Sequence, residues 1–395
     1  MPHALALAVE VATTVLTVAG MGYFAAALIA ARLFLASRRK TQAAFAPSVS
    51  ILKSLKGLDP GMLDAFRSHC RQNYSGEYEI LFGVGSISDP AVSAVEQLQR
   101  EFPEMAIQLV ECSQQLGANG KVSTLAQLVP HARNEFLLIN DSDISVGPHY
   151  LERILACFAQ SPAEHRRSSQ PVGLVTALYR GRALHTLFSR FESLGIATDF
   201  NAAVLLAQMV ERGLRYGLGS TLAVRREALE QIGGYASLVD QLADDYELGA
   251  RIAEAGYAVQ LSREVVETSV PAYTWRDFAD HQLRWLRTVR DARPWGYAGL
   301  VFTHGLSWAL LNVVASGLSP ISLWLLGLTF FLRLTLAMTV GAEVLGDHQV
   351  LAGLWLLPMR DLVAMGLWAA GFAGNTIVWR GERFVVKRGE LHKMA

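Results

Sequence analysis

Two aspartates separated by one serine stand directly after an apolar run in this chain. The stretch reads Phe136-Leu-Leu-Ile-Asn-Asp141-Ser-Asp143, which predicts a buried strand over residues 135–140 that delivers two carboxylates to its carboxyl end. Open α/β sheets bind ligands at that end of their strands. Two carboxylates flanking one small residue can hold a hard divalent cation, and the cation can hold a diphosphate. The sequence therefore suggests an enzyme that handles a nucleotide-linked substrate.

Asp89 and Lys121 are two further residues that could contact such a substrate. Asp89 follows a second predicted strand and precedes Pro90, so it either caps a helix or accepts hydrogen bonds from a nucleobase or ribose. Lys121 follows the turn Gly117-Ala-Asn-Gly120, so it is either a solvated surface charge or a partner for a diphosphate beside Asp141. Both alternatives stay open for each residue.

A pair of aspartates, Asp244 and Asp245, begins a helical pattern that continues to Ala255. Asp244 could cap that helix, because a carboxylate is favoured at a helix start. Asp245 would then point into a cleft and act as general base on an acceptor hydroxyl. Upstream, Gly219 lies in a glycine-rich stretch that either lets an acceptor approach the backbone closely or forms a simple turn before the next strand.

The sequence His281-Gln-Leu-Arg284-Trp285 places three functional side chains three and four residues apart. On a helix they share one face. Arginine suits a phosphate because its donors form a bidentate fork, and tryptophan offers a flat apolar wall. The alternative is an amphipathic surface helix beside a membrane, where arginine and tryptophan are common.

The elements that must position these residues alternate between strands and helices over residues 47–290. Besides the strand at 135–140, the pattern predicts strands at 49–52, 78–84 and 107–110, and helices at 62–73, 90–102 and 120–129. This alternation is typical of an α/β fold with a parallel sheet and helices on both faces. The Gly-x-Gly-x-x-Gly dinucleotide fingerprint is absent after the first strand, so a nucleotide must be gripped in another way.

Two regions outside that domain are apolar enough for a membrane. Residues 11–31 carry no charge and are followed by Arg32 and by Arg38-Arg39-Lys40. About 20 apolar residues cross a bilayer. The long apolar run and the positive charge after it favour an uncleaved anchor over a cleaved signal peptide. The positive-inside rule then places the following domain in the cytosol.

The second apolar region lies near the carboxyl terminus. Residues 300–332 carry no charge, and Pro320 predicts a break between two helices there. Residues 351–378 are interrupted by Arg360-Asp361, which leaves open a spanning helix, a hairpin or a re-entrant element. Residues 184–209 form either an interfacial helix or an amphipathic core helix. The predicted domains are an anchor at 1–36, a catalytic domain at 47–290, a membrane region at 298–378 and a basic tail at 379–395.

Composition narrows the functional classes. The 35 Lys and Arg residues balance 35 Asp and Glu residues, so no basic excess points to nucleic acid. Three scattered cysteines disfavour disulfides and a zinc site and favour a reducing compartment.

Together these motifs resemble the aspartate series and (Gln/Arg)-x-x-Arg-Trp motif of inverting membrane glycosyltransferases with the GT-A fold. More narrowly, residues 51–60 (Ile-Leu-Lys-Ser-Leu-Lys-Gly-Leu-Asp-Pro), Gly117-Ala-Asn-Gly-Lys121-Val-Ser and Ala243-Asp-Asp-Tyr246 resemble ceramide glucosyltransferases. The resemblance covers roughly residues 10–380. It implies a Rossmann-like cytosolic domain with one amino-terminal and two or more carboxyl-terminal membrane helices.

Within that group the chain is most similar to the glycosyltransferases of bacterial hopanoid biosynthesis. The likeness rests on Tyr179-Arg-Gly181, on His281-Gln-Leu-Arg-Trp285, on Gly296-Tyr-Ala-Gly299 with Thr303-His304, and on Val378-Trp-Arg-Gly381. It implies transfer of N-acetylglucosamine from UDP to bacteriohopanetetrol at the bacterial inner membrane. The alternative is a ceramide or diacylglycerol glucosyltransferase that uses UDP-glucose. A processive polysaccharide synthase and a non-enzymatic membrane scaffold are the rival hypotheses.

The resemblance also implies roles for the donor-binding residues. Asp89 and Lys121 would grip the uridine and phosphate portion of the UDP-sugar. Asp141, helped by Asp143, would hold a Mg²⁺ or Mn²⁺ ion on the diphosphate. Eukaryotic ceramide enzymes tend to have a smaller residue in place of Asp143, so the resemblance gives Asp141 the main part in metal binding.

The remaining implied roles concern the acceptor and the motif helix. Asp245 would deprotonate the lipid hydroxyl that attacks the anomeric carbon, with inversion. Arg284 and Trp285 would close over the diphosphate or line the acceptor path. His281 stands where the family has Gln or Arg, and this departure leaves its role open. Asp244 and Gly219 are expected to belong to the same motifs.

Overall fold

The computed structural model describes residues 2–37, 45–159, 170–379, 382–387 and 389–393. The chain packs as two compact units, of which the first comprises 1–38, 183–210 and 272–388, and the second comprises 39–182, 211–271 and 389–395. The basic run Arg38-Arg39-Lys40, and Arg380 and Gly381 of the last predicted motif, lie outside the described residues. The four domain boundaries expected from the sequence stay a prediction.

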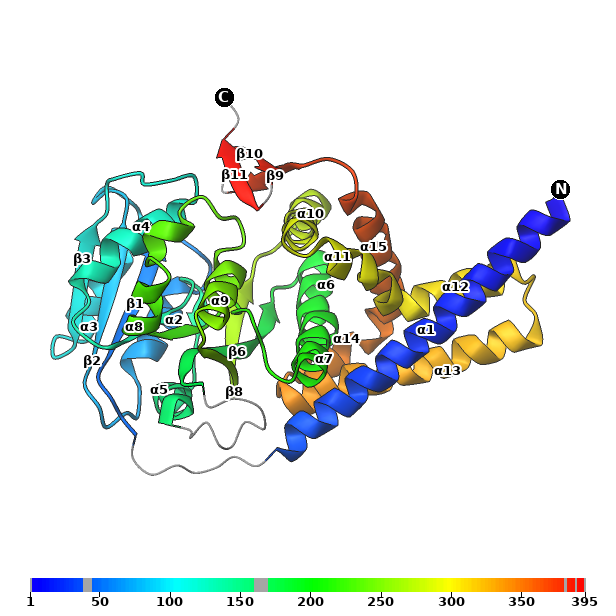
Figure 1. The fold of residues 1–395 in the computed structure, drawn as a ribbon, viewed down its shortest axis with the longest axis horizontal. Helices are drawn as coiled ribbons and strands as arrows, with labels where there is room; N and C mark the ends of the chain where they lie inside the picture. The colour runs from blue at the N-terminus through cyan, green and yellow to red at the C-terminus, as the bar shows by residue number, and fades with distance from the viewer. Residues whose placement is uncertain (1, 38–44, 160–169, 380–381, 388, 394–395) are drawn as a thin grey trace. The chain divides into compact units, whose positions relative to one another are not determined.

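The second unit is built on one sheet of eight strands (Figure 1). The strands are β1 (Val49–Leu55), β2 (Tyr78–Val84), β3 (Ala106–Glu111), β4 (Phe136–Ile139), β5 (Ile144–Ser145), β6 (Val172–Ala183), β7 (Leu222–Arg225) and β8 (Ala258–Val270). Their order across the sheet is β3-β2-β1-β4-β7-β6-β8-β5.

The first four strands form a parallel half-sheet. β1 pairs in parallel with β2 on one side and with β4 on the other, and β2 pairs in parallel with β3. The chain therefore reverses its direction of travel across the sheet between β1 and β4, which is where open α/β sheets form a ligand crevice. All four strands predicted from the sequence in this region are confirmed.

Helices cover both faces of the parallel half. They are α2 (Met62–Cys70), α3 (Ala91–Glu101) and α4 (Gly120–Leu128), and the short turn η1 (Val129–His131) follows α4. Right-handed crossovers place α2 and α3 on one face and α4, which returns the chain to β4, on the other. In agreement, α2 packs on α3 and α4 packs on β1 and β2. The three predicted helices are confirmed within two or three residues of their ends.

The remaining strands correct the expectation of a purely parallel sheet. β7 pairs antiparallel with both β4 and β6, and β5 pairs antiparallel with β8. Around them lie α5 (Tyr150–Leu155), η2 (Ala156–Ala159), α8 (Arg226–Gln231), η5 (Tyr235–Leu238), α9 (Asp244–Glu254) and the last strand β11 (Glu390–Lys393). The sheet is therefore mixed, with a parallel half and a half that contains antiparallel pairs.

The first unit is mainly helical. Its elements are α1 (Pro2–Ala36), α6 (Leu187–Gly195), η4 (Ile196–Phe200), α7 (Asn201–Glu211), α10 (Trp275–Ala292), α11 (Pro294–Gly299), η6 (Leu300–His304), α12 (Gly305–Ala315), α13 (Pro320–Ala337), η7 (Met338–Val344), α14 (Gln349–Gly353), η8 (Leu354–Leu356), α15 (Leu357–Gly371), β9 (Thr376–Trp379) and β10 (Glu382–Lys387). β9 and β10 pair antiparallel. The break expected at Pro320 is confirmed, because α12 ends at Ala315 and Pro320 is the first residue of α13.

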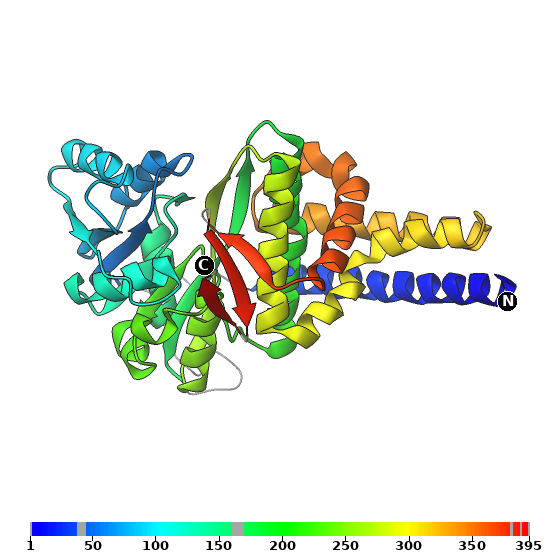
Figure 2. The same ribbon diagram turned by 90° about the horizontal axis from the view of Figure 1, so that it is seen from above.

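Helix α1 lies side by side with α12 and α13 (Figure 2). The closest approach to α12 is at two glycines, where a side-chain carbon on Gly20 would lie 2.3 Å from the Cα atom of Gly305. Thr13 and Thr14 both donate hydrogen bonds to the amide oxygen of Asn312, at 3.1 and 2.9 Å. Small residues and interhelical hydrogen bonds of this kind hold helices together in membranes.

Within the part of the chain that the structure describes, five helical stretches are long and apolar enough to cross a membrane. They are Ala4–Ala36, Leu187–Glu211, Pro294–Ala315, Pro320–Val344 and Gln349–Gly371. The stretch interrupted by Arg360-Asp361 is thus helical from 349 to 371 and is followed by β9. Residues 187–211, for which two kinds of helix were expected, are also of spanning length, and 56% of their most apolar window is buried.

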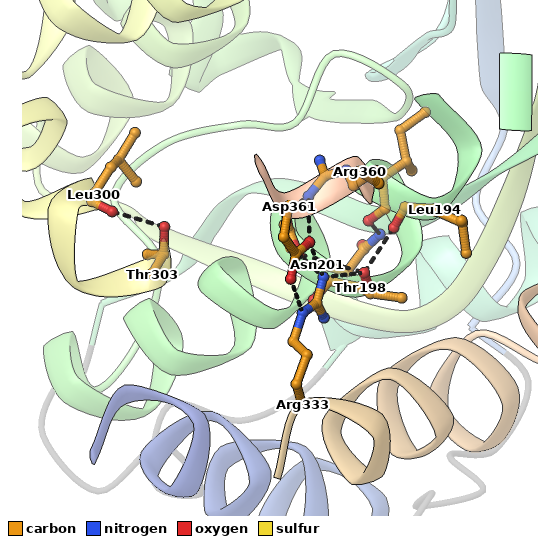
Figure 3. A network of polar contacts seen from close by, with 10 residues as sticks. Leu194, Thr198, Asn201, Leu300, Thr303, Arg333, Arg360 and Asp361 are labelled. Atoms are coloured by element: carbon orange, nitrogen blue, oxygen red, sulfur yellow. Dashed lines mark hydrogen bonds and ion pairs between the residues drawn. The ribbon is translucent and has the colours of Figure 1, made fainter. Parts of the chain in front are cut away.

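Within these apolar helices, Arg333 and Arg360 pair with Asp361 (Figure 3) and with Asp199. Arg333 of α13 is 1% exposed, and its guanidinium contacts Asp361 of α15 at 2.8 and 3.0 Å. It also contacts Asp199 of η4 at 2.6 Å and the hydroxyl of Thr198 at 3.0 Å. Arg360 contacts the second oxygen of Asp199. The two arginines and two aspartates form a neutral group, as expected for charges inside a membrane region.

Candidate active site

The Asp141-Ser142-Asp143 turn stands at the carboxyl end of β4, as predicted. The four residues of β4 are all buried, and the chain turns immediately afterwards, with the amide of Ile144 3.4 Å from the Asp141 carbonyl oxygen. The side chain of Asp141 is 44% exposed. Asp143 accepts a hydrogen bond from the hydroxyl of Thr268 on β8. Burial and the charge of Asp141 raise the pKa of Asp143.

Lys121 reaches this turn from the first turn of α4. Its Nζ atom lies 2.7 Å from Asp141 Oδ1 and 3.7 Å from Asp244 Oδ2. Burial opposes the charge on Lys121, but the carboxylates of Asp141 and Asp244 outweigh it and raise the pKa of the ammonium. Of the two roles considered for Lys121, the solvated surface charge is wrong, because its side chain is only 21% exposed and ion-paired.

The start of α4 is fixed by Asn119, a residue that sequence reasoning did not single out. Its side-chain oxygen accepts the amide of Val122 at 3.2 Å and so caps the helix. Its amide nitrogen donates to the carbonyl of Gln241 at 2.8 Å, three residues before Asp244. One buried asparagine therefore ties Lys121 to the segment that carries Asp244 and Asp245. An asparagine just before a predicted helix was the available signal.

Asp244 and Asp245 are the first two residues of α9. The sequence suggested that Asp244 could cap this helix, but neither aspartate does so. The cap position is Ala243, and no side chain makes a capping hydrogen bond there. Asp244 faces Lys121 instead, and burial raises its pKa. Asp245 accepts the amide of Tyr246 at 2.8 Å. Burial and the neighbouring charge of Asp244 raise the pKa of Asp245 to about 6, against the opposing charge of Lys121.

Gly219 lies against the carboxylate of Asp245. A side-chain carbon at Gly219 would be 3.0 Å from Asp245 Oδ2. The same turn is bound to α9 by the amide of Gly217, which donates to the Asp245 carbonyl at 3.2 Å. The amide of Thr221 donates to the carbonyl of Leu218 at 3.1 Å, so the stretch is the expected turn before β7. A side chain at Gly219 would therefore crowd one oxygen of the candidate base.

Asn140 links this turn to the aspartate turn after β4. Its amide nitrogen donates to the carbonyl of Ser220 at 2.7 Å and to the hydroxyl of Tyr150 at 2.9 Å. Its oxygen lies 3.1 Å from His69 Nε2. Asn140 is 1% exposed, so this network fixes Gly219 and Asp141 relative to each other from within the core. The sequence pattern treats Asn140 only as the end of an apolar run.

Asp89 supports the start of α3 and also holds the loop after β1. Its Oδ1 atom accepts the amide of Ala91 at 2.9 Å and the amide of Gly57 at 2.9 Å. Gly57 has a φ angle of 72°, which favours glycine. The cap position of α3 is Pro90, so Asp89 supports the start of the helix from one residue earlier. The nucleotide contact expected of Asp89 stays a prediction.

The motif residues on α10 belong to the first unit. His281 Nδ1 lies 3.3 Å from Glu192 Oε1, and its ring stacks on Tyr273 at 5.5 Å between centroids. Trp285 lies 5.2 Å from the His281 ring and 6.1 Å from that of Phe200. Gln282 donates to Glu192 Oε2 at 2.5 Å. Glu192, 3% exposed, was not singled out from the sequence; the structure shows that it anchors this motif to α6.

The carboxylates fit a divalent cation that is completed by a substrate. Among the described residues, no three His, Cys, Asp or Glu side chains form a self-contained metal cage. Mg²⁺ bound with phosphates commonly takes only one or two protein carboxylates and leaves the other positions to phosphate and water. Asp141 and Asp143 match that donor set, because both are carboxylates on one turn and Asp141 is half exposed.

The second unit therefore brings together an acidic turn, a lysine and a carboxylate with a raised pKa. Asp141, Lys121, Asp244, Asp245 and Gly219 form one connected group. Such a group can bind an anionic leaving group at one end and accept a proton from a hydroxyl at the other. No nucleophilic side chain is needed for a single displacement.

Known proteins similar to this chain act on sugars. Ceramide glucosyltransferase 3 of Caenorhabditis elegans is 24% identical over 353 residues, which span 86% of this chain and 72% of that protein. Ceramide glucosyltransferase 1 of the same organism is 22% identical over 354 residues, spanning 87% and 72%.

The fold is also found among solved structures. The mannosyltransferase PcManGT from Pyrobaculum calidifontis, solved with GDP-Man and Mn²⁺, superposes with a TM-score of 0.56 at 18% sequence identity. The alignment covers 92% of this chain and 99% of that one. This likeness confirms the expected GT-A-like α/β fold. The sequence profile of glycosyl transferase family 21 matches residues 12–392, nearly the whole chain. The chain therefore belongs to glycosyl transferase family 21 and is a glycosyltransferase.

Proposed function

We propose that this enzyme transfers glucose from UDP-glucose to the hydroxyl of a ceramide-type membrane lipid, with inversion at the anomeric carbon. The proposal is carried by the connected group of Asp141, Lys121, Asp244 and Asp245 in a chain of this family. The names of the two nematode relatives favour ceramide and glucose. The apolar helices of spanning length among the described residues favour a lipid acceptor.

In the proposed reaction Asp245 accepts the proton of the acceptor hydroxyl. As that proton leaves, the acceptor oxygen forms a bond to the anomeric carbon. The bond from this carbon to the diphosphate oxygen breaks, and UDP departs with the electron pair. A base with a pKa of about 6 is ionised at neutral pH yet still basic enough to assist, which suits Asp245. The lack of a side chain at Gly219 avoids crowding one oxygen of that base.

The donor end is assigned to the opposite side of the same group. Lys121 offers a permanent positive charge to the diphosphate, and its pairing with Asp141 fixes where that charge stands. A Mg²⁺ or Mn²⁺ ion bound by Asp141 and Asp143 would neutralise charge on the leaving UDP. Asp89 and the Gly57 loop are proposed to receive the uridine. Arg284 and Trp285 are proposed to act on the diphosphate or the acceptor.

The membrane setting follows from the acceptor. A glycolipid precursor keeps its hydrocarbon in the bilayer and presents only its headgroup. We therefore place the enzyme in a membrane with its catalytic unit on the cytosolic side, where the positive-inside rule puts the domain after α1. For a bacterial source this would be the inner membrane. The alternative, transfer of N-acetylglucosamine to a hopanoid polyol, rests on motif likeness alone. It is tested in the same experiment.

The deciding experiment is a matrix of donors and acceptors with the purified, detergent-solubilised protein. UDP-glucose and UDP-N-acetylglucosamine are each combined with ceramide, diacylglycerol and bacteriohopanetetrol, and products are identified by mass spectrometry. A single β-linked hexose on ceramide is expected. N-acetylhexosamine on bacteriohopanetetrol would instead establish the hopanoid hypothesis.

Two further outcomes separate the rival classes. A ladder of products on a denaturing gel would indicate a processive polysaccharide synthase. An absence of product together with no divalent-dependent UDP binding by calorimetry would indicate a non-enzymatic scaffold. The Asp245→Asn variant serves as the negative control for turnover.

A further inference from the structure

Lys53 is a fully buried lysine in the middle of the sheet. It lies near the carboxyl end of β1, where six of the seven side chains are buried, and its own exposure is 0%. Its register places it beside the end of β4, because Leu52 pairs with Ile139. The Nζ atom lies 5.9 Å from the centre of the Phe66 ring. Placing an ammonium here costs folding free energy, because the charge loses its hydration.

The hydrogen bond that Lys53 makes is to the aspartate turn itself. Its Nζ atom donates to the backbone carbonyl of Asp141 at 3.1 Å. That carbonyl also receives the amide of Ile144, at 3.4 Å, and so closes the turn that carries Asp141 and Asp143. Burial lowers the pKa of Lys53 to about 7, and the charges of Asp141 and Asp143 oppose that shift. A lysine can donate this hydrogen bond in either protonation state.

The same turn is held from its other side by the loop after β1. The hydroxyl of Ser142, the middle residue of the turn, donates to the carboxylate of Asp59. Ser142 is 4% exposed, so the serine side of this contact is buried. Two residues earlier, the amide of Gly57 is held by Asp89. The loop is thereby tied to both candidate donor-binding carboxylates.

We propose that Lys53 and Asp59 are positioning residues that hold the Asp141-Ser142-Asp143 turn in the geometry that binds a divalent cation and a nucleoside diphosphate. This inference rests on the proposed function and deepens it. Lys53 occupies a site where an apolar side chain of similar length would be easier to bury. The role of Lys53 is therefore to fix the turn, and this role lowers the folding stability of the protein instead of raising it.

The test compares two buried polar residues of the same strand. Lys53→Met keeps the length of the side chain and removes its donor. Ser50→Ala is the matched control, because Ser50 is also 0% exposed but donates to Glu79, at 2.7 Å, away from the turn. Thermal unfolding, Mn²⁺ binding by electron paramagnetic resonance and UDP binding by calorimetry, with and without Mn²⁺, are measured on the full chain in detergent.

Opposite signatures are expected from the two variants. Lys53→Met should weaken Mn²⁺ and Mn²⁺-dependent UDP binding by about 10- to 100-fold, as loss of a residue behind metal ligands typically does. Its Tm should be unchanged or higher, because a buried polar group is replaced by an apolar one. Ser50→Ala should lower the Tm and leave both affinities unchanged.

Asp59 gives an independent check at a half-exposed position. Asp59→Ala removes the acceptor for Ser142 and should weaken Mn²⁺ binding, whereas Asp59→Asn keeps an acceptor oxygen and should retain most of it. Wild-type affinity in Lys53→Met, or a fall in its Tm as large as that of Ser50→Ala, would overturn the inference, and so would failure of Lys53→Met to fold. If the wild-type protein itself binds neither Mn²⁺ nor UDP, the proposed function fails instead.

Discussion

The ammonium of Lys121 lies 2.7 Å from the carboxylate of Asp141, although the two residues come from different elements of the sheet domain. Lys121 opens α4, and Asp141 follows β4, the strand to which α4 leads. Because the lysine also faces Asp244 at 3.7 Å, it stands between the turn proposed for the donor and the helix proposed to carry the base. A change at Lys121 should therefore affect both donor binding and proton transfer.

Lys121→Gln tests this double role. Loss of the charge should lower turnover by about 100-fold, because a preorganised group on a leaving anion typically contributes that much. It should also shift the acidic limb of the pH–rate profile upward, since the positive charge of Lys121 lowers the pKa of Asp245. Initial rates between pH 5 and 9 measure both effects. Arg100→Gln, on the exposed end of α3, is the charge-matched control.

Asp244→Asn should shift the same limb in the opposite direction. Burial and the negative charge of Asp244 together raise the pKa of Asp245 to about 6, so removal of that charge lowers the pKa of Asp245. Turnover should then persist to lower pH than in the wild type, whose acidic limb is expected near pH 6. The measurement is again the dependence of kcat/KM on pH. An unshifted limb would show that Asp245 is not the group that titrates.

Asp245→Asn addresses the base directly. Without a proton acceptor, transfer should fall by about 100- to 10,000-fold, the usual contribution of general base catalysis. UDP affinity by calorimetry should change little, because the donor is assigned to Lys121 and Asp141. Unaltered turnover would contradict the assignment of the base, and a parallel loss of UDP binding would place Asp245 in the donor site.

The parallel half of the fold was predictable because its signals are local. Each strand from β1 to β4 is a short apolar run, and each helix between them repeats apolar residues at helical spacing. Since the carboxyl ends of parallel strands meet at one edge, the positions of Asp89 and Asp141 after their strands already predicted a shared edge. For Lys121 the sequence left two alternatives open, a solvated surface charge and a position beside Asp141.

The rest depends on contacts that leave no local pattern. Lys53 looks like the start of a loop, and only the pairing of β1 with β4 reveals that it is buried under Asp141. The contact between Glu192 and His281 joins two helices far apart in the chain. Arg360-Asp361 stood out as adjacent charges, yet the sequence could not assign Arg333 to Asp361. The antiparallel strands were missed because their neighbours are set by tertiary pairing.

Gly219→Ala tests the close approach of the turn to Asp245. The added carbon would lie 3.0 Å from Asp245 Oδ2, so the carboxylate must move by a few tenths of an ångström. Misplacement of a catalytic group by such amounts should lower kcat by about tenfold while the Tm changes little. Gly327→Ala is the control, since nothing lies within 4 Å of a carbon added there. Equal kcat values for the two variants would argue against the contact.

Arg333→Met tests whether the buried ion pairs around Arg333 stabilise the first unit more than exposed ion pairs do. Arg333 is 1% exposed and contacts both Asp361 and Asp199, so its removal leaves the buried Asp361 carboxylate with Arg360 alone, at 3.5 Å. Breaking one side of a buried pair costs about 3–5 kcal/mol. Thermal unfolding of the detergent-solubilised protein should show a clear fall in Tm.

The matched control for Arg333 is another arginine that joins two helices of the same unit. Arg32 of α1 contacts Glu343 at 2.6 Å, but the two side chains are 58% and 45% exposed. Exposed pairs contribute less than about 1 kcal/mol, so Arg32→Met should barely change the Tm. If both variants lower the Tm equally, burial does not set the strength of these pairs. The network around Arg333 would then have no special part in holding α13, α15 and η4 together.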